Sequence, residues 1–141
     1  MRLRTICCVA VILSASWTAL CPAAEHNVPP EGFVALFNGK DLAGWWGAKT
    51  EDPRNHIALP PEELAAKKAA SMEDVNQHWR VENGELINNG TGLYLTTDGL
   101  YDDFELLISY KMVEGADSGI YLKGVPQVQI WDSNDETKFK H

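Results

Sequence analysis

Short runs of alternating apolar and polar residues, separated by turn residues, constrain this chain more than any other feature. They recur at roughly ten-residue spacing through the second half of the sequence. Each such run places its apolar side chains on one face of a β-strand, and the turns reverse the chain. The pattern predicts an all-β fold, an antiparallel β-sandwich or barrel. The expected strands are residues 33–37, 79–82, 85–88, 92–97, 103–113, 118–124 and 126–132.

Two of these predictions have the strongest local signals. Asn83-Gly84 separates two short runs and is typical of a two-residue hairpin turn. Residues 103–113 form the longest run, with apolar side chains at the even positions and mostly polar ones at the odd positions. That alternation indicates a half-buried antiparallel strand.

One helix is expected, as an insertion between the strands. Pro61 suits the first turn of a helix, and Glu62 and Glu63 place carboxylates at its positive end. We therefore predict a helix over residues 61–77. Before it, we expect one ring of the pair Trp45-Trp46 to close the core and the other to be half exposed.

The first 24 residues have the organisation of a secretory signal peptide. Arginines near the start precede a short apolar run and a small-residue segment, which predicts cleavage near Ala23 or Ala24 and export. The apolar run is too short for a comfortable membrane span. A lipid anchor at Cys21 is the alternative, although Leu20 is bulky for that signal. Residues 25–31 are expected to be a linker, and residues 32–141 the domain.

Composition excludes several classes of function. Cleavage would remove every cysteine of the chain, leaving neither a disulfide nor a thiolate metal site. The net charge of −8 makes nucleic acid a poor partner. The four histidines are scattered, and we interpret them as surface residues. The run Asp132 to Glu136 lacks the glycine of a calcium loop, so no metal site is predicted. The sequence leaves the identity of any cofactor open.

The run QVQIW points to a binding face. Gln127, Gln129 and Trp131 share one side of an extended strand, and Val128 and Ile130 share the other, where we expect them to be buried between sheets. Amides cannot exchange protons at neutral pH, but they can orient a hydroxylated ligand, and an indole can stack on a sugar ring. The alternative is a solvated sheet face with incidental glutamines.

The preceding run, DSGIYLK, adds further candidates. By alternation Tyr121 and Lys123 share a face beside the glutamine strand, where either could stabilise an oxyanion or enolate. The alternative is a core tyrosine and a solvated lysine. Asp117, Asp132 and Glu105 are the carboxylates that could join this face, and whether one does so separates catalysis from binding alone.

Four blocks of the chain resemble a known family in the same order. They are GFVALFNGKDLAGWW, HWRVENGELINNGTGLYLTT, YDDFELLISYKMVEGADSGIYLKG and PQVQIWD, and they span residues 32–132. Together they resemble the 3-keto-disaccharide hydrolase domain. The resemblance implies a concanavalin A-like jelly roll in an exported protein whose concave face binds a sugar. Many members have a glutamate at the position of Gln127. The strands up to Asp132 would fill about half of such a jelly roll, so we expect an incomplete domain.

The resemblance also implies a reaction. A ketone at C3 of a glycoside acidifies the hydrogen at C2, so a modest base and an enolate-stabilising group could eject the leaving group at C1, after which water adds. We expect Asp117, Lys123 and Asp132 as catalytic residues, and Tyr121, Gln127, Gln129 and Trp131 as substrate-binding residues. The alternative function is a non-catalytic carbohydrate-binding module. In either case the partner is a carbohydrate.

Overall fold

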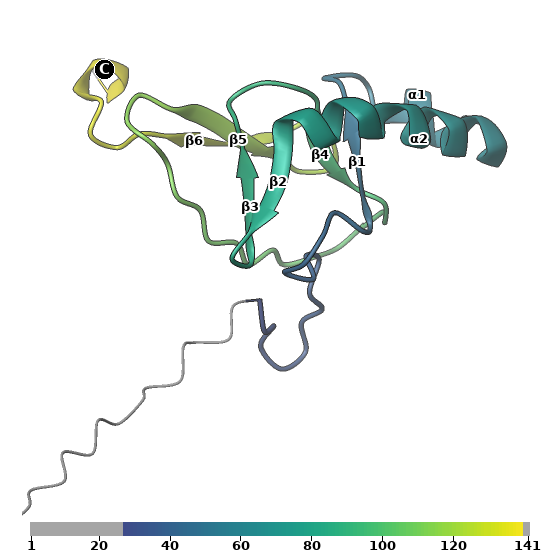
Figure 1. Ribbon diagram of the computed structural model, residues 1–141, viewed down its shortest axis with the longest axis horizontal. Coiled ribbons are helices and arrows are strands. Elements are labelled where there is room, and N and C mark those ends of the chain that lie inside the picture. Colours follow the sequence, from purple (N-terminus) through teal and green to yellow (C-terminus); the bar gives the residue numbers. More distant parts are fainter. Residues whose placement is uncertain (1–26, 140–141) are drawn as a thin grey trace, which may run out of the picture.

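The computed structural model describes residues 27–139, which form three antiparallel strand pairs and one long helix that lies along one edge of the molecule (Figure 1). The predicted signal peptide, with its cysteines and cleavage site, lies outside the described residues. The strand pairs are β1–β4, β2–β3 and β5–β6. The fold is therefore β-rich, as expected. The elements are β1 (Trp45–Ala48), α1 (Arg54–Ile57), α2 (Pro61–His78), β2 (Trp79–Glu82), β3 (Glu85–Asn88), β4 (Tyr94–Thr97), β5 (Asp117–Tyr121), β6 (Gln127–Trp131) and the 3₁₀ turn Glu136–Phe139.

The β2–β3 hairpin confirms the prediction from Asn83-Gly84. Both residues have positive φ, 52° at Asn83 and 79° at Gly84. Asparagine and glycine tolerate this left-handed conformation, which matches the twist of the two flanking strands. The turn sequence therefore determines the register, in which Glu82 lies opposite Glu85.

Helix α2 also confirms its prediction and packs on β1. Val75 is fully buried, and the Ser71 hydroxyl accepts a hydrogen bond of 2.9 Å from the Gly47 amide. A Cβ atom at Gly47 would lie 2.7 Å from Val75 Cγ2, so only glycine allows this close approach. Helix and strand are thus joined by one buried hydrogen bond and by direct packing.

The tryptophan pair behaves as expected. Trp46 is 2% exposed and belongs to the core, whereas Trp45 is half-buried. The Trp46 indole nitrogen donates to the Thr97 carbonyl across the β1–β4 pair, at 3.3 Å. The pairing of strands β1 and β4 was not predicted from the sequence, because β1 has no alternating pattern.

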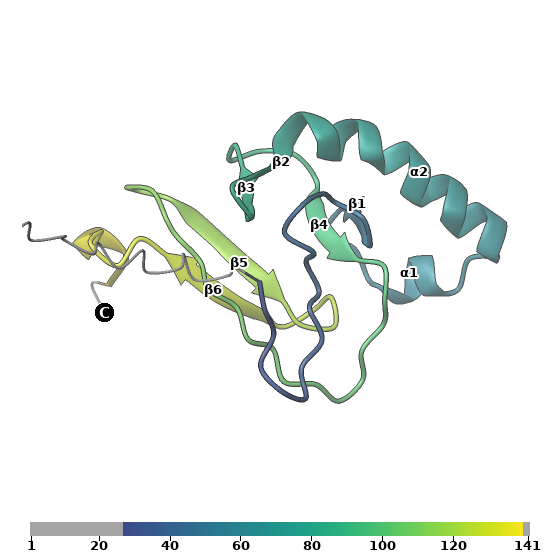
Figure 2. The ribbon, with the colours of Figure 1, turned by 60° about the horizontal axis from the view of Figure 1, so that its bottom comes forward.

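Two predicted strands are wrong. Residues 33–37 and residues 103–113 form no strand, although both have strand-like composition. Alternation reports which face of a segment is apolar, but a strand also requires a neighbour at hydrogen-bonding distance. Figure 2 shows the segment between β4 and β5 running as a long extended connection. The two facing sheets of a sandwich are not assembled among residues 27–139, and no helix in this range is long and apolar enough to cross a membrane.

Candidate functional site on the β5–β6 hairpin

The register of the β5–β6 hairpin brings most of the predicted site residues together. Asp117 lies opposite Trp131, Gly119 opposite Gln129, and Tyr121 opposite Gln127. Paired residues of an antiparallel ladder point to the same side. We call this side the glutamine face. It comprises Asp117, Gly119, Tyr121, Gln127, Gln129 and Trp131.

Hydrogen bonds and close packing organise the middle of the glutamine face. The Gln129 amide nitrogen donates to Asp117 Oδ1 at 2.5 Å and to the Ser118 carbonyl at 2.9 Å. The Gln127 side chain lies across Gly119, where an added Cβ atom would overlap its amide group. The absence of a side chain at Gly119 therefore makes room for Gln127.

An aromatic residue from another sheet adjoins this face. The ring of Tyr94 in β4 meets the ring of Tyr121 edge to face, with centroids 5.6 Å apart and an interplanar angle of 81°. Such pairs are favourable beyond simple area burial. Sequence reasoning did not single out Tyr94, because strand alternation carries no information on contacts between separate sheets.

The glutamine face is open to solvent. Gln127, Gln129 and Asp117 are exposed, while Tyr121 and Trp131 are half-buried. On the opposite side of β6, Ile130 is 6% exposed, which confirms its predicted burial. The same prediction is wrong for Val128, which is 49% exposed, because no second sheet in the described part of the chain covers it.

Lys123 lies outside the hairpin strands. Strand β5 ends at Tyr121, and Lys123 occupies the following turn with a φ of 51° and an exposed side chain. Side chains alternate between two faces only within a strand. Because β5 ends at Tyr121, the prediction that Lys123 shares a face with Tyr121 does not hold. Glu105 is likewise exposed in the extended connection before β5 and belongs to neither strand of the hairpin.

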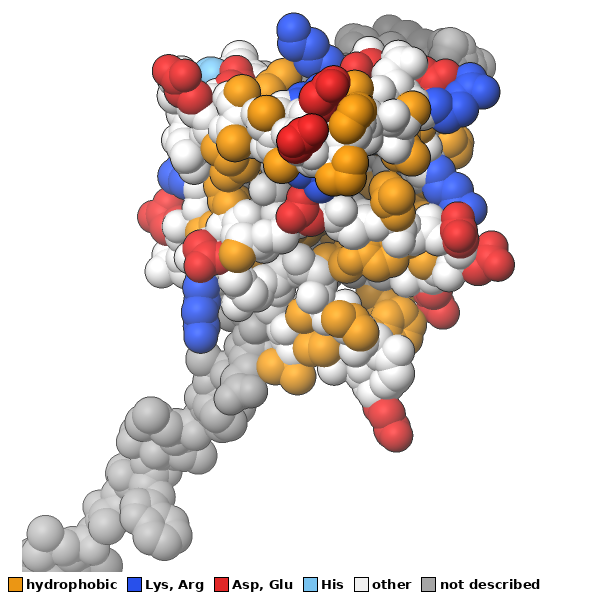
Figure 3. All heavy atoms as spheres, turned by 90° about the vertical axis from the view of Figure 1, so that its right-hand side faces the viewer, with side chains coloured by type: hydrophobic (Ala, Val, Ile, Leu, Met, Phe, Trp, Pro, Cys, Tyr) orange, Lys and Arg blue, Asp and Glu red, His pale blue; other side chains and the backbone are white. Residues whose placement is uncertain are grey.

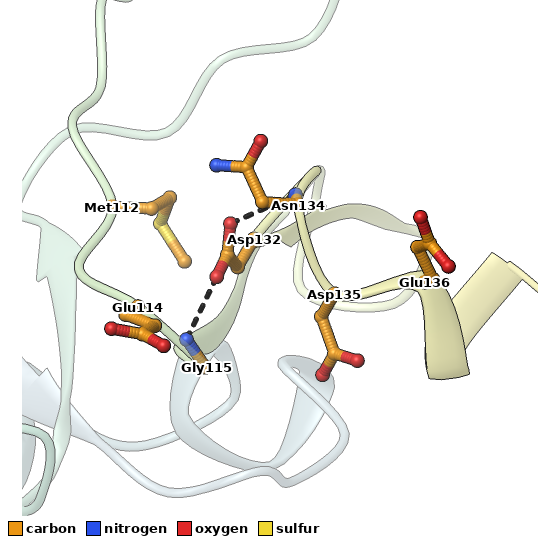
Figure 4. A pocket seen from close by; sticks show the side chains of 7 residues that line it. All are labelled: Met112, Glu114, Gly115, Asp132, Asn134, Asp135 and Glu136. Carbon is orange, nitrogen blue, oxygen red and sulfur yellow. Dashed lines mark hydrogen bonds between the residues drawn. The ribbon is translucent and has the colours of Figure 1, made fainter.

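Asp132 follows β6 and braces two turns (Figure 4). Its side chain accepts hydrogen bonds from the Gly115 amide at 2.8 Å and from the Asn134 amide at 3.0 Å, and the residue is 7% exposed. It thereby ties the turn before β5 to the turn after β6. Asp132 also lines a surface hollow at this end of the hairpin, together with the acidic residues Glu114 and Asp135. Within residues 27–139 no group of three or more histidine or acidic side chains could hold a metal ion.

The comparison with protein families now adds to this geometry. A family model for the 3-keto-alpha-glucoside-1,2-lyase-like domain matches residues 32–141. The chain belongs to this family. The match confirms the resemblance seen in the four sequence blocks and relates the lyase-like domain to 3-keto-glycosides. Comparisons with curated proteins and with solved structures find no match.

Proposed function

We propose that this lyase-like domain cleaves 3-keto-glycosides at the glutamine face, with Asp117 as the general base. The observation that carries the proposal is the hairpin register, which sets an exposed carboxylate directly across from Trp131 and within hydrogen-bonding distance of Gln129. A face with only amides and rings could bind a sugar but could not take up a proton.

The proposed reaction begins at C2 of the keto sugar. Asp117 removes the C2 proton, and the electron pair moves to the C3 ketone oxygen to give an enolate. When the enolate collapses, the C3 ketone re-forms and the electron pair from C2 makes the C1=C2 double bond. The bond from C1 to the glycosidic oxygen breaks at the same time, and the leaving group departs with the electrons of that bond and takes a proton from solvent. Water then adds across the resulting enone. The net result is hydrolysis of the glycoside.

Each remaining group of the face has a part in this proposal. The Tyr121 hydroxyl and the Gln127 amide are donors that could stabilise the enolate oxygen. Gln129 orients the Asp117 carboxylate through its 2.5 Å hydrogen bond. The rings of Trp131 and Tyr121 offer apolar surfaces for a pyranose. Asp132 and Lys123 lie outside this constellation, so we assign them no catalytic part.

The family assignment also supports the expected concanavalin A-like jelly roll, with the glutamine face on its concave side. This arrangement is a proposal about the whole domain, and an experimentally determined structure would test it. Two stacked sheets with the hairpin in one of them are the expected result. An architecture without facing sheets would contradict it.

The variant Asp117→Asn tests the mechanism. With a 3-keto-disaccharide, release of the monosaccharide should fall by about 10²–10⁴-fold, because the amide cannot act as a base. Exchange of the C2 hydrogen with deuterated solvent should fall in parallel. Product release followed by chromatography, and exchange followed by NMR, are the measurements.

Glu105→Gln is the matched control, since it neutralises an exposed carboxylate outside the hairpin. It should leave both readouts unchanged. Unaltered turnover in Asp117→Asn would contradict the assignment of the base. If the unmodified protein binds the keto sugar without releasing product, the domain is a carbohydrate-binding module, a role that hydrogen-bonding glutamines would serve.

A further inference from the structure

The glutamine face is longer than a single sugar ring. Asp117 and Trp131 form the residue pair at one end of the face, and Tyr121 and Gln127 form the pair at the other end. Asp117 and Tyr121 lie four positions apart in β5, so at about 3.3 Å per residue the face is about 13 Å long. A pyranose ring that stacks on Trp131 beside Asp117 therefore leaves the Tyr121 end of the face unoccupied.

Two tyrosine rings stand at that end. Tyr94 in β4 is 49% exposed, and its ring meets the ring of Tyr121 at an interplanar angle of 81°. We call these two rings the tyrosine corner. A sugar ring that lies flat on one ring of the corner meets the other ring at its edge. The tyrosine corner thus offers a second apolar surface for a sugar, separate from the one that Trp131 offers.

The tyrosine corner lies where the hairpin meets the rest of the molecule. Tyr94 pairs with Ala48 in β1, which is buried. The turn after β5 lies against Pro53, because a Cβ atom added at Gly124 would be 3.0 Å from Pro53 Cγ. Figure 2 shows the end of β5, where Tyr121 lies, directed toward β4. Because both rings are carried by strands that contact their neighbours, little further ordering is needed before a ligand binds.

We propose that the tyrosine corner is a second sugar subsite, and that Tyr94 makes the site selective for 3-keto-glycosides whose leaving group is itself a sugar. The inference rests on the proposed function, which sets the base Asp117, and with it the keto sugar, at the Trp131 end of the face. The leaving sugar then lies toward the Tyr121 end, within reach of Tyr94. A glycoside with a small leaving group makes no contact with this subsite.

Two substrates with the same keto sugar test the subsite, a 3-keto-disaccharide and the corresponding 3-keto methyl glycoside. In Tyr94→Leu, kcat/KM for the disaccharide should fall about tenfold relative to kcat/KM for the methyl glycoside, because leucine offers no flat ring for stacking. Tyr94→Phe keeps the ring and should preserve the ratio of the unmodified protein. A loss of hairpin stability lowers both values alike, so it cancels in this ratio.

Tyr101→Leu is the matched control. Tyr101 is 48% exposed, and its ring also meets another ring edge to face, that of Phe104, with centroids 6.4 Å apart. It belongs to neither strand of the hairpin, so its truncation should leave the ratio unchanged. An unchanged ratio in Tyr94→Leu, or the same altered ratio in Tyr94→Phe, would overturn the subsite.

Failure of the proposed function has a different signature, because the unmodified protein would then release no product from either substrate. Titration calorimetry with the two keto sugars decides on the subsite in that case. Tyr94→Leu should weaken binding of the disaccharide about tenfold more than binding of the methyl glycoside. Equal changes in the two affinities would overturn the subsite alone, and absence of binding by either sugar would overturn both proposals.

Discussion

At the scale of single residues, Gly119 controls the shape of the proposed site. Gln127 lies across it, so Gly119→Ala should displace the Gln127 amide and weaken sugar binding about tenfold through a lost hydrogen bond. The unfolding free energy should change by no more than about 1 kcal/mol, because alanine is tolerated in strands. Titration calorimetry with a keto sugar, together with urea unfolding, would separate the two effects.

The control for this substitution is Ser118→Ala. Ser118 precedes Gly119 in β5, and alternation points its side chain to the opposite side of the hairpin. Its truncation should leave sugar binding intact. Equal binding by Gly119→Ala and by the unmodified chain would show that Gln127 makes no contact with the ligand.

His56 is a residue for which the surface interpretation is wrong. Its side chain is 13% exposed and meets the Trp46 ring edge to face, with centroids 5.3 Å apart. Burial lowers the pKa of His56 from its usual 6.5, and the nearby charge of Lys67 lowers the pKa further, against the opposing effect of Glu51. The lowered pKa favours the neutral form of the His56 imidazole in the folded chain.

The lowered pKa predicts a loss of stability in acid. The unfolded chain binds the proton more tightly than the folded chain. The contribution of His56 to the unfolding free energy should therefore be greatest above pH 6.5, and it should fall as the pH drops from 6.5 through the lower pKa of the folded state. Urea unfolding at a series of pH values measures this slope. His56→Gln, which cannot titrate, should flatten it. An identical slope in both proteins would exclude His56 as the cause.

At the scale of secondary-structure elements, burial differs along the apolar side of β6. Ile130 is buried and Val128 is half exposed, although both lie on the same side of the strand. Ile130→Ala should therefore lower the unfolding free energy by ~2–5 kcal/mol through lost packing. Val128→Ala is the matched control and should have a much smaller effect in thermal or urea unfolding. Comparable losses would mean that Val128 is covered in solution.

Short sequence signals correctly predicted the elements that are determined by residues close together in the sequence. Asn83-Gly84 determined one hairpin turn, and Pro61 with its following carboxylates determined the start of α2. The failures have non-local causes. The 103–113 segment has the correct alternation and lacks a partner, whereas β1 lacks alternation and is held by β4 and α2.

The same distinction applies to the candidate site. Alternation predicted that Gln127, Gln129 and Trp131 share a face, and the register confirms that Tyr121 joins them. It could not predict that Lys123 enters a turn, since that depends on where the ladder ends. Nor could it choose among three carboxylates, because the position of Asp117 opposite Trp131 follows from pairing between strands.

At the scale of the whole molecule, the elements pack in two groups. Helix α2 packs on β1 and β2, while β5 and β6 contact chiefly each other and lie toward the other end of the molecule (Figure 2). Hydrophobic side chains are visible among charged ones on the side where α2 begins (Figure 3). Among residues 27–139 the buried apolar core is small, comprising Trp46, Ala48, Val75 and Ile130.

The edge-to-face contact of Tyr94 with Tyr121 therefore has a thermodynamic consequence. It connects the β5–β6 hairpin to β4, which belongs to a different sheet. A hairpin so connected can open locally at a lower free energy than the unfolding of the whole chain. A ligand that bridges Tyr121 and Gln127 binds only the closed hairpin, so it must raise that opening free energy. For the proposed site, affinity for substrate and local stability of the hairpin should thus be linked, and truncation of the Tyr94 ring should change both.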